Sequence, residues 1–237
     1  MDQAIWATWY DLPTEGREAY LAWLHGAYIP KLLKKPGFLH AAHYASAKVP
    51  PRPRLNHADD PTVPTGGEYV LLFGAETAHA FANPGPHKLN AELPPEDRKM
   101  LAMRRGERVS IFIEVARVDG PAAKQPGGEM TLSPCIQIGS FGSGTADEEE
   151  ILEFYTQVRM PEMTRVPGCV RMRKLISVAG WARNGCLYEF ASLADHKNMA
   201  ARKQEPSAKT WTDVLIPKFK HVPGTPIVAQ RIWPPLN

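Results

Sequence analysis

The chain has 237 residues, a formal net charge of +3, 43% hydrophobic and 22% charged residues, a composition typical of soluble globular proteins. So small a net charge, with lysine and arginine spread along the chain, argues against a nucleic-acid partner. The first residues show no basic stretch followed by an apolar run, and no apolar stretch approaches the roughly eighteen residues of a membrane span. We therefore expect a cytoplasmic protein without a membrane partner. The three cysteines lack CxxC spacing, which disfavours a disulfide framework and a zinc site.

Hydrophobic periodicity predicts the same order of elements in both halves of the chain. The first half predicts a strand, a helix, two strands, a helical region and a strand at residues 5–10, from 14, 39–48, 68–74, 95–105 and 109–118. The second half predicts a strand at 135–141, a helix from 145, strands at 170–178 and 185–191, helical pieces at 193–203 and 211–218, and a strand at 226–233. The segment 119–129, rich in Pro, Gly and Ala, is predicted to be a linker.

The two halves are also similar in sequence at an offset of 131 residues, the separation of Pro30 from Pro161. The matched residues are Pro30, Pro36 and Gly37 with Pro161, Pro167 and Gly168, and Tyr20, Trp23, Leu24 and Ala27 with Ile151, Phe154, Tyr155 and Val158. The second set is the apolar face of one helix, so a whole helix recurs together with its end. This pattern indicates an internal duplication.

Each copy has a helix with an aromatic residue, then an Ile-Pro or Met-Pro step, then Pro-Gly and an exiting strand. This motif resembles the dimeric α+β barrel superfamily of ferredoxin-like domains. Members include dehydratase-like and EthD-like proteins, muconolactone isomerases, polyketide cyclases, cofactor-free monooxygenases and, in tandem form, haem enzymes of the chlorite dismutase type. Many members carry histidine just before the Ile-Pro step, where this chain has Tyr28 and Arg159. A mechanism that rests on that histidine therefore does not transfer.

The resemblance implies an α+β fold in which two tandem ferredoxin-like βαββαβ halves close one barrel within the chain. We expect an N-terminal half at 1–119, a linker at 120–131 and a C-terminal half at 132–237. A homodimer of this chain stays open. Relative to the second half, the first carries an insertion at 48–67, for which a plain loop, a lid and a proline-rich docking segment are the alternatives.

Strand alternation separates side chains that face the helices from those that face the barrel interior. Val170, Met172 and Ile176 mark the helix-facing side of one strand, which turns the two arginines between them inward. The same reasoning, carried through the other strands and the offset, gives the inward set Trp6, His40, Tyr44, Phe112, Glu114, Gln137, Arg171, Arg173 and Glu189. His43 is expected to face the helices.

The charged members of this set suggest specific roles. A hairpin around 180–184 would place Arg173 opposite Glu189, either as a structural ion pair or as ligand contacts. Arg171 has no obvious carboxylate partner except Glu114, which favours an anionic group on the ligand. His40 is the first candidate for general acid–base catalysis, with a structural histidine as the alternative.

We therefore expect a cofactor-independent lyase, dehydratase or isomerase that transfers a proton on a small anionic, aromatic or polyketide-like molecule. The expected catalytic residues are His40 and Glu114, and the expected substrate-binding residues are Trp6, Tyr44, Phe112, Gln137, Arg171, Arg173 and Glu189. The alternatives are a non-catalytic small-molecule-binding protein, a cofactor-free monooxygenase and a haem enzyme. For haem, the C-terminal half offers only His196 and His221 as imidazole ligands. We expect no cofactor and no metal.

Overall fold

Eight strands form one closed antiparallel barrel in a computed structural model that describes residues 1–47, 49, 55–123, 133–202 and 210–236. The strands are β1 (Ala4–Asp11), β2 (Phe38–Ser46), β4 (Tyr69–Ala75), β5 (Arg105–Asp119), β6 (Cys135–Gly142), β7 (Cys169–Ala179), β8 (Asn184–Phe190) and β10 (Ile227–Trp233). Their order is β10-β2-β4-β1-β5-β7-β8-β6, and pairing of β10 with β6 closes the ring. The fold class is therefore α+β with a closed barrel, as the sequence predicts.

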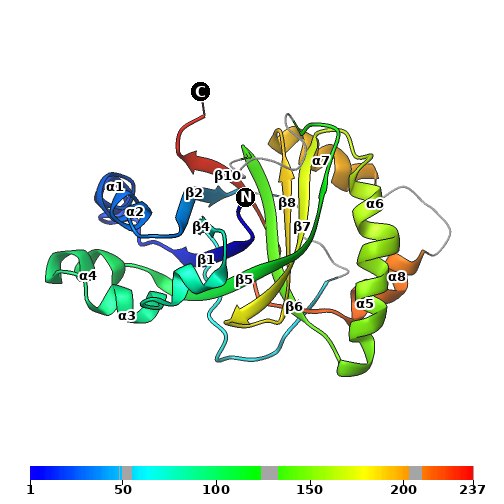
Figure 1. Ribbon diagram of the computed structural model, residues 1–237, viewed down its shortest axis with the longest axis horizontal. Helices are drawn as coiled ribbons and strands as arrows, with labels where there is room; N and C mark the ends of the chain where they lie inside the picture. The colour runs from blue at the N-terminus through cyan, green and yellow to red at the C-terminus, as the bar shows by residue number, and fades with distance from the viewer. Residues whose placement is uncertain (48, 50–54, 124–132, 203–209, 237) are drawn as a thin grey trace.

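Two seams join the strands of the first half of the chain to those of the second. One seam is the antiparallel pair β5–β7, and the other is β10–β2. The helices of the first half lie on one side of the barrel and those of the second half on the other (Figure 1). The barrel interior is therefore built by both halves, and its strand ends bring together residues far apart in the sequence.

The helices that precede β2 and β7 share an unusual feature. They are α1 (Arg17–Trp23) and α2 (Ile29–Leu33), joined by a π turn at Leu24–Tyr28, and α5 (Glu148–Phe154) and α6 (Met160–Met163), joined by a π turn at Tyr155–Arg159. A proline follows each π turn at the second residue of the next helical segment. Proline lacks the N–H for the helical hydrogen bond and crowds the preceding turn, which accounts for the widened turn in both places.

The remaining helices follow the third strand of each half. They are α3 (Pro86–Ala91) and α4 (Pro95–Leu101) after β4, and α7 (Leu193–Arg202) and α8 (Trp211–Leu215) after β8. The predicted helical region at 95–105 ends earlier than expected because β5 begins at Arg105. None of the helices in the described part of the chain is long and apolar enough to cross a bilayer.

Three apolar clusters show which face of each strand is inside. Two clusters lie under the helices, one in each half, and a third fills the barrel interior with residues of both halves. The interior cluster contains Ile5, Ala7, Trp9, Ala42, Tyr44, Val70, Leu72, Phe112, Ile136, Ile138, Leu175, Leu187, Ile227 and Ala229. Much of the barrel interior is thus a packed core.

The predicted inward orientation of Trp6 and Gln137 is wrong. Trp6 belongs to the helix-facing cluster, where its ring lies 5.0 Å from that of Phe73. Gln137 forms a hydrogen bond of 2.9 Å with His196 of α7, again on the helix side. Residues 4–10 of β1 and 135–141 of β6 are all buried, so neither face of these strands is exposed to solvent. On such strands, hydrophobic alternation does not show which side chains face the barrel interior and which face the helices.

The described part of the insertion, residues 49 and 55–67, is packed against the second half of the chain; its other residues, 48 and 50–54, lie outside the described residues, as does most of the linker. Asn56–His57 forms a short parallel pair, β3–β9, with Lys220–His221. Val63 packs against Ala182 and Val222. In Figure 1 this segment, drawn in cyan, runs along the lower end of the barrel.

Candidate active site

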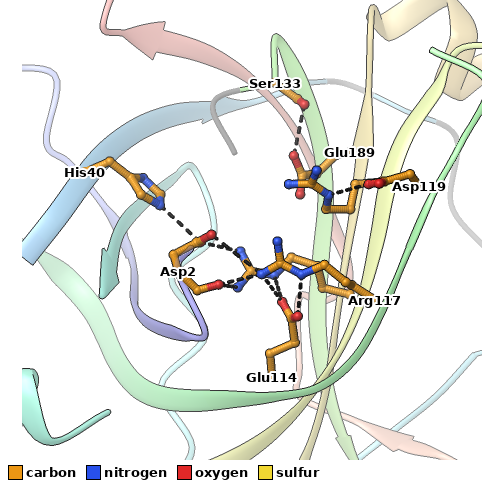
Figure 2. Close-up of polar contacts among 9 residues, drawn as sticks. Asp2, His40, Glu114, Arg117, Asp119, Ser133 and Glu189 are labelled. Atoms are coloured by element: carbon orange, nitrogen blue, oxygen red, sulfur yellow. Dashed lines mark hydrogen bonds and ion pairs between the residues drawn. The ribbon is translucent and has the colours of Figure 1, made fainter. Parts of the chain in front are cut away.

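A buried group of polar side chains occupies one end of the barrel interior (Figure 2). We call it the charged cluster: Asp2, His40, Glu114, Arg117, Asp119, Ser133, Arg171, Arg173 and Glu189. Its members come from the beginnings of β2 and β7, the ends of β5 and β8, and the residues just before β1 and β6. Neighbouring strands are antiparallel, so the beginning of one meets the end of the next and the cluster gathers at one rim.

Arg173 and Asp2 form the centre of the cluster, and both side chains are fully buried. Nη1 of Arg173 donates to Oδ2 of Asp2 at 2.6 Å, and Nη2 donates to the main-chain oxygen of Asp2 at 3.1 Å. Burial raises the pKa of Asp2, but the hydrogen bond from His40 and the charge of Arg173 outweigh it and hold this pKa well below its usual range. Asp2 is therefore a carboxylate in the folded protein.

Glu114 lies between two arginines. It accepts hydrogen bonds from Nε of Arg173 and Nε of Arg117, and a further one of 2.8 Å from Nη2 of Arg117. Arg117 was not among the expected site residues, because simple alternation from Glu114 turns it outward. A bulge between Glu114 and Ala116 shifts the register and brings Arg117 inside.

The same bulge brings Asp119 inward, opposite Arg171. Nε of Arg171 donates to Oδ1 of Asp119 at 2.8 Å. The expectation that only Glu114 could pair with Arg171 is thus wrong. The expected register of the hairpin is wrong as well, because Glu189 lies opposite Arg171 and Arg173 lies opposite Leu187.

Glu189 is fully buried beside these arginines. Its Oε2 accepts a hydrogen bond of 2.9 Å from Oγ of Ser133, and the Tyr44 hydroxyl donates to the main-chain oxygen of Ser133 at 3.2 Å. Within the described residues, Oε1 has no hydrogen-bond partner. Burial raises the pKa of Glu189 to about 7, although the charges of Arg173 and Arg171 lower it in part. This carboxyl group therefore exchanges its proton near neutral pH.

His40 enters the cluster from β2. Its Nε2 lies 3.1 Å from Oδ2 of Asp2, and its Nδ1 has no partner in the part of the chain that the structure describes. The ring packs against Gly74, where an added Cβ would lie 2.0 Å from Nε2. Only glycine leaves room for the imidazole at this position, so β4 contributes to the placement of His40.

The other expected site residues separate into two groups. Phe112 and Tyr44 face the interior as predicted. His43 faces the helices as predicted, where it contacts the Tyr10 hydroxyl at 2.8 Å and His25 at 2.9 Å. Trp6 and Gln137 lie outside the barrel and do not line the charged cluster.

The two histidines considered for haem do not face the barrel interior. His196 bonds to Gln137 on the helix side, and the ring of His221 lies 5.6 Å from that of Phe141 in the helix-facing cluster. Neither imidazole is therefore placed as an axial ligand in the barrel. Among the described residues, no group of three or more His, Cys, Asp or Glu side chains is arranged to hold a metal ion.

Comparison with known proteins supports the fold. Neither family profiles nor curated protein sequences match this chain. Among solved structures, an anthrone oxidase-like protein covers 98% of this chain and 92% of its own, with TM-score 0.61 and 10% identity. A candidate monooxygenase from Fusobacterium nucleatum covers 98% and 93%, with TM-score 0.59 and 10% identity. A dye-decolorizing peroxidase from Bacteroides thetaiotaomicron covers 98% and 93%, with TM-score 0.57 and 10% identity. These likenesses agree with the closed α+β barrel fold of this chain.

Proposed function

We propose that this chain is a small-molecule enzyme that works by proton transfer at the charged end of its barrel, with Glu189 and His40 as the groups that move the proton. One observation carries the proposal. Each of these side chains has one polar atom held by a neighbour and one without a partner among the described residues. A group held in this way is oriented yet still able to accept or donate a proton.

The contact with Asp2 fixes the proton on His40. Asp2 is a carboxylate and can only accept, so Nε2 of His40 donates to it. In the neutral ring the lone pair is then on Nδ1, the atom that is without a partner within the described residues. His40 is therefore suited to act as a general base, and Glu189, with its pKa near 7, can act as the partner acid or base.

Arg173 and Glu114 have a positioning role in this proposal. All three guanidinium nitrogens of Arg173 donate within the cluster, and both oxygens of Glu114 accept from arginines. This differs from the sequence-based hypothesis, in which Glu114 moves the proton and Arg173 binds the substrate. The positive charge of Arg171 and Arg173 nevertheless favours negative charge that develops near Glu189.

The substrate class that suits these groups is a small carbonyl compound or phenol with an acidic proton, whose enolate the arginines stabilise. Removal of that proton is the first step of an isomerase, dehydratase or lyase reaction. A second candidate is oxygenation without a cofactor, which the likeness to an anthrone oxidase-like protein and a candidate monooxygenase favours. There the carbanion forms a C–O bond with O2, which is reduced by two electrons, and the proton removed earlier returns to give a hydroperoxide. The hydroperoxide then loses the second hydrogen of that carbon together with hydroxide, as water, and leaves a ketone.

Deuterium exchange tests the proton transfer directly. Anthrone and a panel of enolisable ketones and phenols are incubated with the protein in anaerobic D2O, and loss of the acidic C–H signal is followed by NMR. We expect the protein to accelerate exchange for at least one compound, and His40→Ala and Glu189→Gln to slow it roughly a hundredfold. The exposed matched controls His87→Ala and Glu153→Gln should exchange at the parent rate.

Exchange at the parent rate in both site variants, or for no compound at all, contradicts the proposal. Oxygen uptake with the exchanged compound, one O2 consumed for each ketone and water formed, would assign the oxygenase reaction. Saturable binding without exchange would identify the non-catalytic binding protein instead.

The finer architecture belongs to the same proposal. We infer that the chain is a tandem duplication of a ferredoxin-like βαββαβ unit, with halves at 1–119 and 132–237 joined by the linker 120–131. The strand order β5-β1-β4-β2 of one half parallels β10-β6-β8-β7 of the other, and the π turns at 24–28 and 155–159 keep the 131-residue offset. A small-molecule ligand, a cytoplasmic location and no nucleic-acid or membrane partner complete the proposal; a homodimer stays open.

A further inference from the structure

A second arginine site lies at the opposite end of the barrel. Arg108 stands directly opposite Trp9 in the β1–β5 pair, and its guanidinium carbon lies 4.2 Å from the centre of the Trp9 ring. Trp9 is fully buried in the interior cluster, and Arg108 is only 5% exposed. Phe112 meets Trp9 edge to face at 6.3 Å on the same side. The guanidinium group is therefore inside the barrel, against an aromatic wall.

The described residues offer this guanidinium no hydrogen-bond acceptor. Nε, Nη1 and Nη2 of Arg108 are all buried without a hydrogen-bond partner among the described residues, and the same holds for Nε1 of Trp9. Other buried arginines are paired: Arg104 bonds to Tyr20 and Glu107, and Arg173 to Asp2 and Glu114. Burial lowers the pKa of Arg108 to about 10, still far above neutral, so the group is a cation.

We propose that Arg108 and Trp9 form a binding site for the carboxylate group of a small molecule. Every unpartnered group there is a donor, and the fork of a guanidinium matches the two oxygens of a carboxylate. The cation–π contact with the face of Trp9 offsets only part of the desolvation cost of burying the guanidinium. A counter-ion is needed to offset the rest. A planar monoanion fits better than phosphate, because a second charge beside Phe112 and Trp9 would be costly to desolvate.

This site is separate from the charged cluster. Arg108 and Glu114 lie on the same strand, six residues apart, which corresponds to roughly 20 Å at about 3.3 Å per residue. The main-chain N–H of Gly66 in the insertion bonds to the oxygen of Gly106 at 3.0 Å, and Ser110 Oγ bonds to the oxygen of Trp181 at 3.3 Å. The insertion and the hairpin after β7 thus lie at the rim nearest the proposed carboxylate site. The proposal of this site does not depend on the proton-transfer proposal.

The test uses the full chain and three probes, acetate, benzoate and inorganic phosphate, at ionic strength matched with chloride. Two signals are followed: the thermal midpoint of unfolding, and the indole N–H resonance of Trp9, assigned with Trp9→Phe. We expect benzoate and acetate to raise the midpoint saturably and to shift the Trp9 resonance. Arg108→Met should weaken the apparent affinity roughly tenfold or more, because charged hydrogen bonds are lost. Arg105→Met, an exposed arginine on the same strand, should bind as the parent does.

Three results would overturn the proposal: no saturable effect of either carboxylate on the parent, an equal effect on Arg108→Met, or tighter binding of phosphate than of both carboxylates. The Trp9 resonance of the parent keeps the test valid if Arg108→Met fails to fold. Arg108→Lys then serves as the second variant, and its weaker carboxylate binding would separate recognition by the guanidinium fork from simple attraction to a positive charge.

Discussion

The two ends of the barrel treat buried arginine in opposite ways. At the charged end, Arg173 reaches Asp2 and Glu114, and Arg171 reaches Asp119. At the other end, Arg108 has an aromatic face and no acceptor among the described residues. A buried ion pair that is complete holds strand ends in register, whereas a buried charge that is incomplete is poised to take up a ligand. In the two proposals above, proton transfer takes place at the first end and a carboxylate binds at the second.

Removal of one arginine from each end should have very different consequences. Arg173→Met removes the fully buried one of the two arginines that pair with Asp2 and Glu114, and we expect it to lower the free energy of unfolding by about 3–5 kcal/mol. Arg108→Met should change it by no more than about 1 kcal/mol, because loss of the cation–π contact and relief of a buried charge oppose each other. Urea denaturation at pH 7 measures both, with the exposed Arg165→Met as the control. Equal losses at the two ends would contradict the distinction.

Glu189 makes the charged end sensitive to pH in a definite direction. Its pKa is about 7 in the folded protein against an ordinary value of 4.5. Below pH 4.5 Glu189 is protonated in both the folded and the unfolded protein, and its contribution to stability is complete. Between pH 4.5 and 7 it stays protonated only in the folded protein, so the free energy of unfolding falls as the pH rises. The loss should reach about 3 kcal/mol and then level off.

Glu189→Gln should remove this slope and leave the protein more stable than the parent above pH 7. Denaturation curves at pH 5, 6, 7 and 8 check both statements, with Glu153→Gln as the exposed control. Asp2 contributes in the opposite sense, because its pKa is lowered and its stabilisation is lost only as the pH falls below its usual range. A parent whose stability is flat from pH 5 to 8 would show that Glu189 is not buried as described.

The sequence predicts the fold better than the contents of the barrel, for reasons visible in single strands. On β7 the apolar set is on one face, so alternation correctly turns Arg171 and Arg173 inward. On β1 both faces are buried, and the same reasoning puts Trp6 inside instead of Trp9. That error conceals the Arg108 end, because Trp9 is the residue that marks it.

Two members of the charged cluster carry no signal in the sequence alone. Arg117 becomes an inward residue only because of the bulge in β5, and no glycine or proline announces that bulge. Asp2 lies before the first strand, where alternation does not apply, and acquires its partners only when β2 and β7 close around it. Long-range pairing, which the sequence does not specify locally, completes the site.

The smallest of the expected effects separates stacking from mere proximity at the Arg108 end. Trp9→Phe keeps an aromatic ring but removes the indole N–H and weakens the cation–π contact. It should therefore lower the free energy of unfolding more in the parent than in the Arg108→Met background. We expect a double-mutant cycle to give a coupling of about 1 kcal/mol in favour of the pair. If the coupling is zero, the contact between Trp9 and Arg108 does not stabilise the protein. No acceptor among the described residues contacts the Arg108 guanidinium, so a bound anion would then have to stabilise its charge.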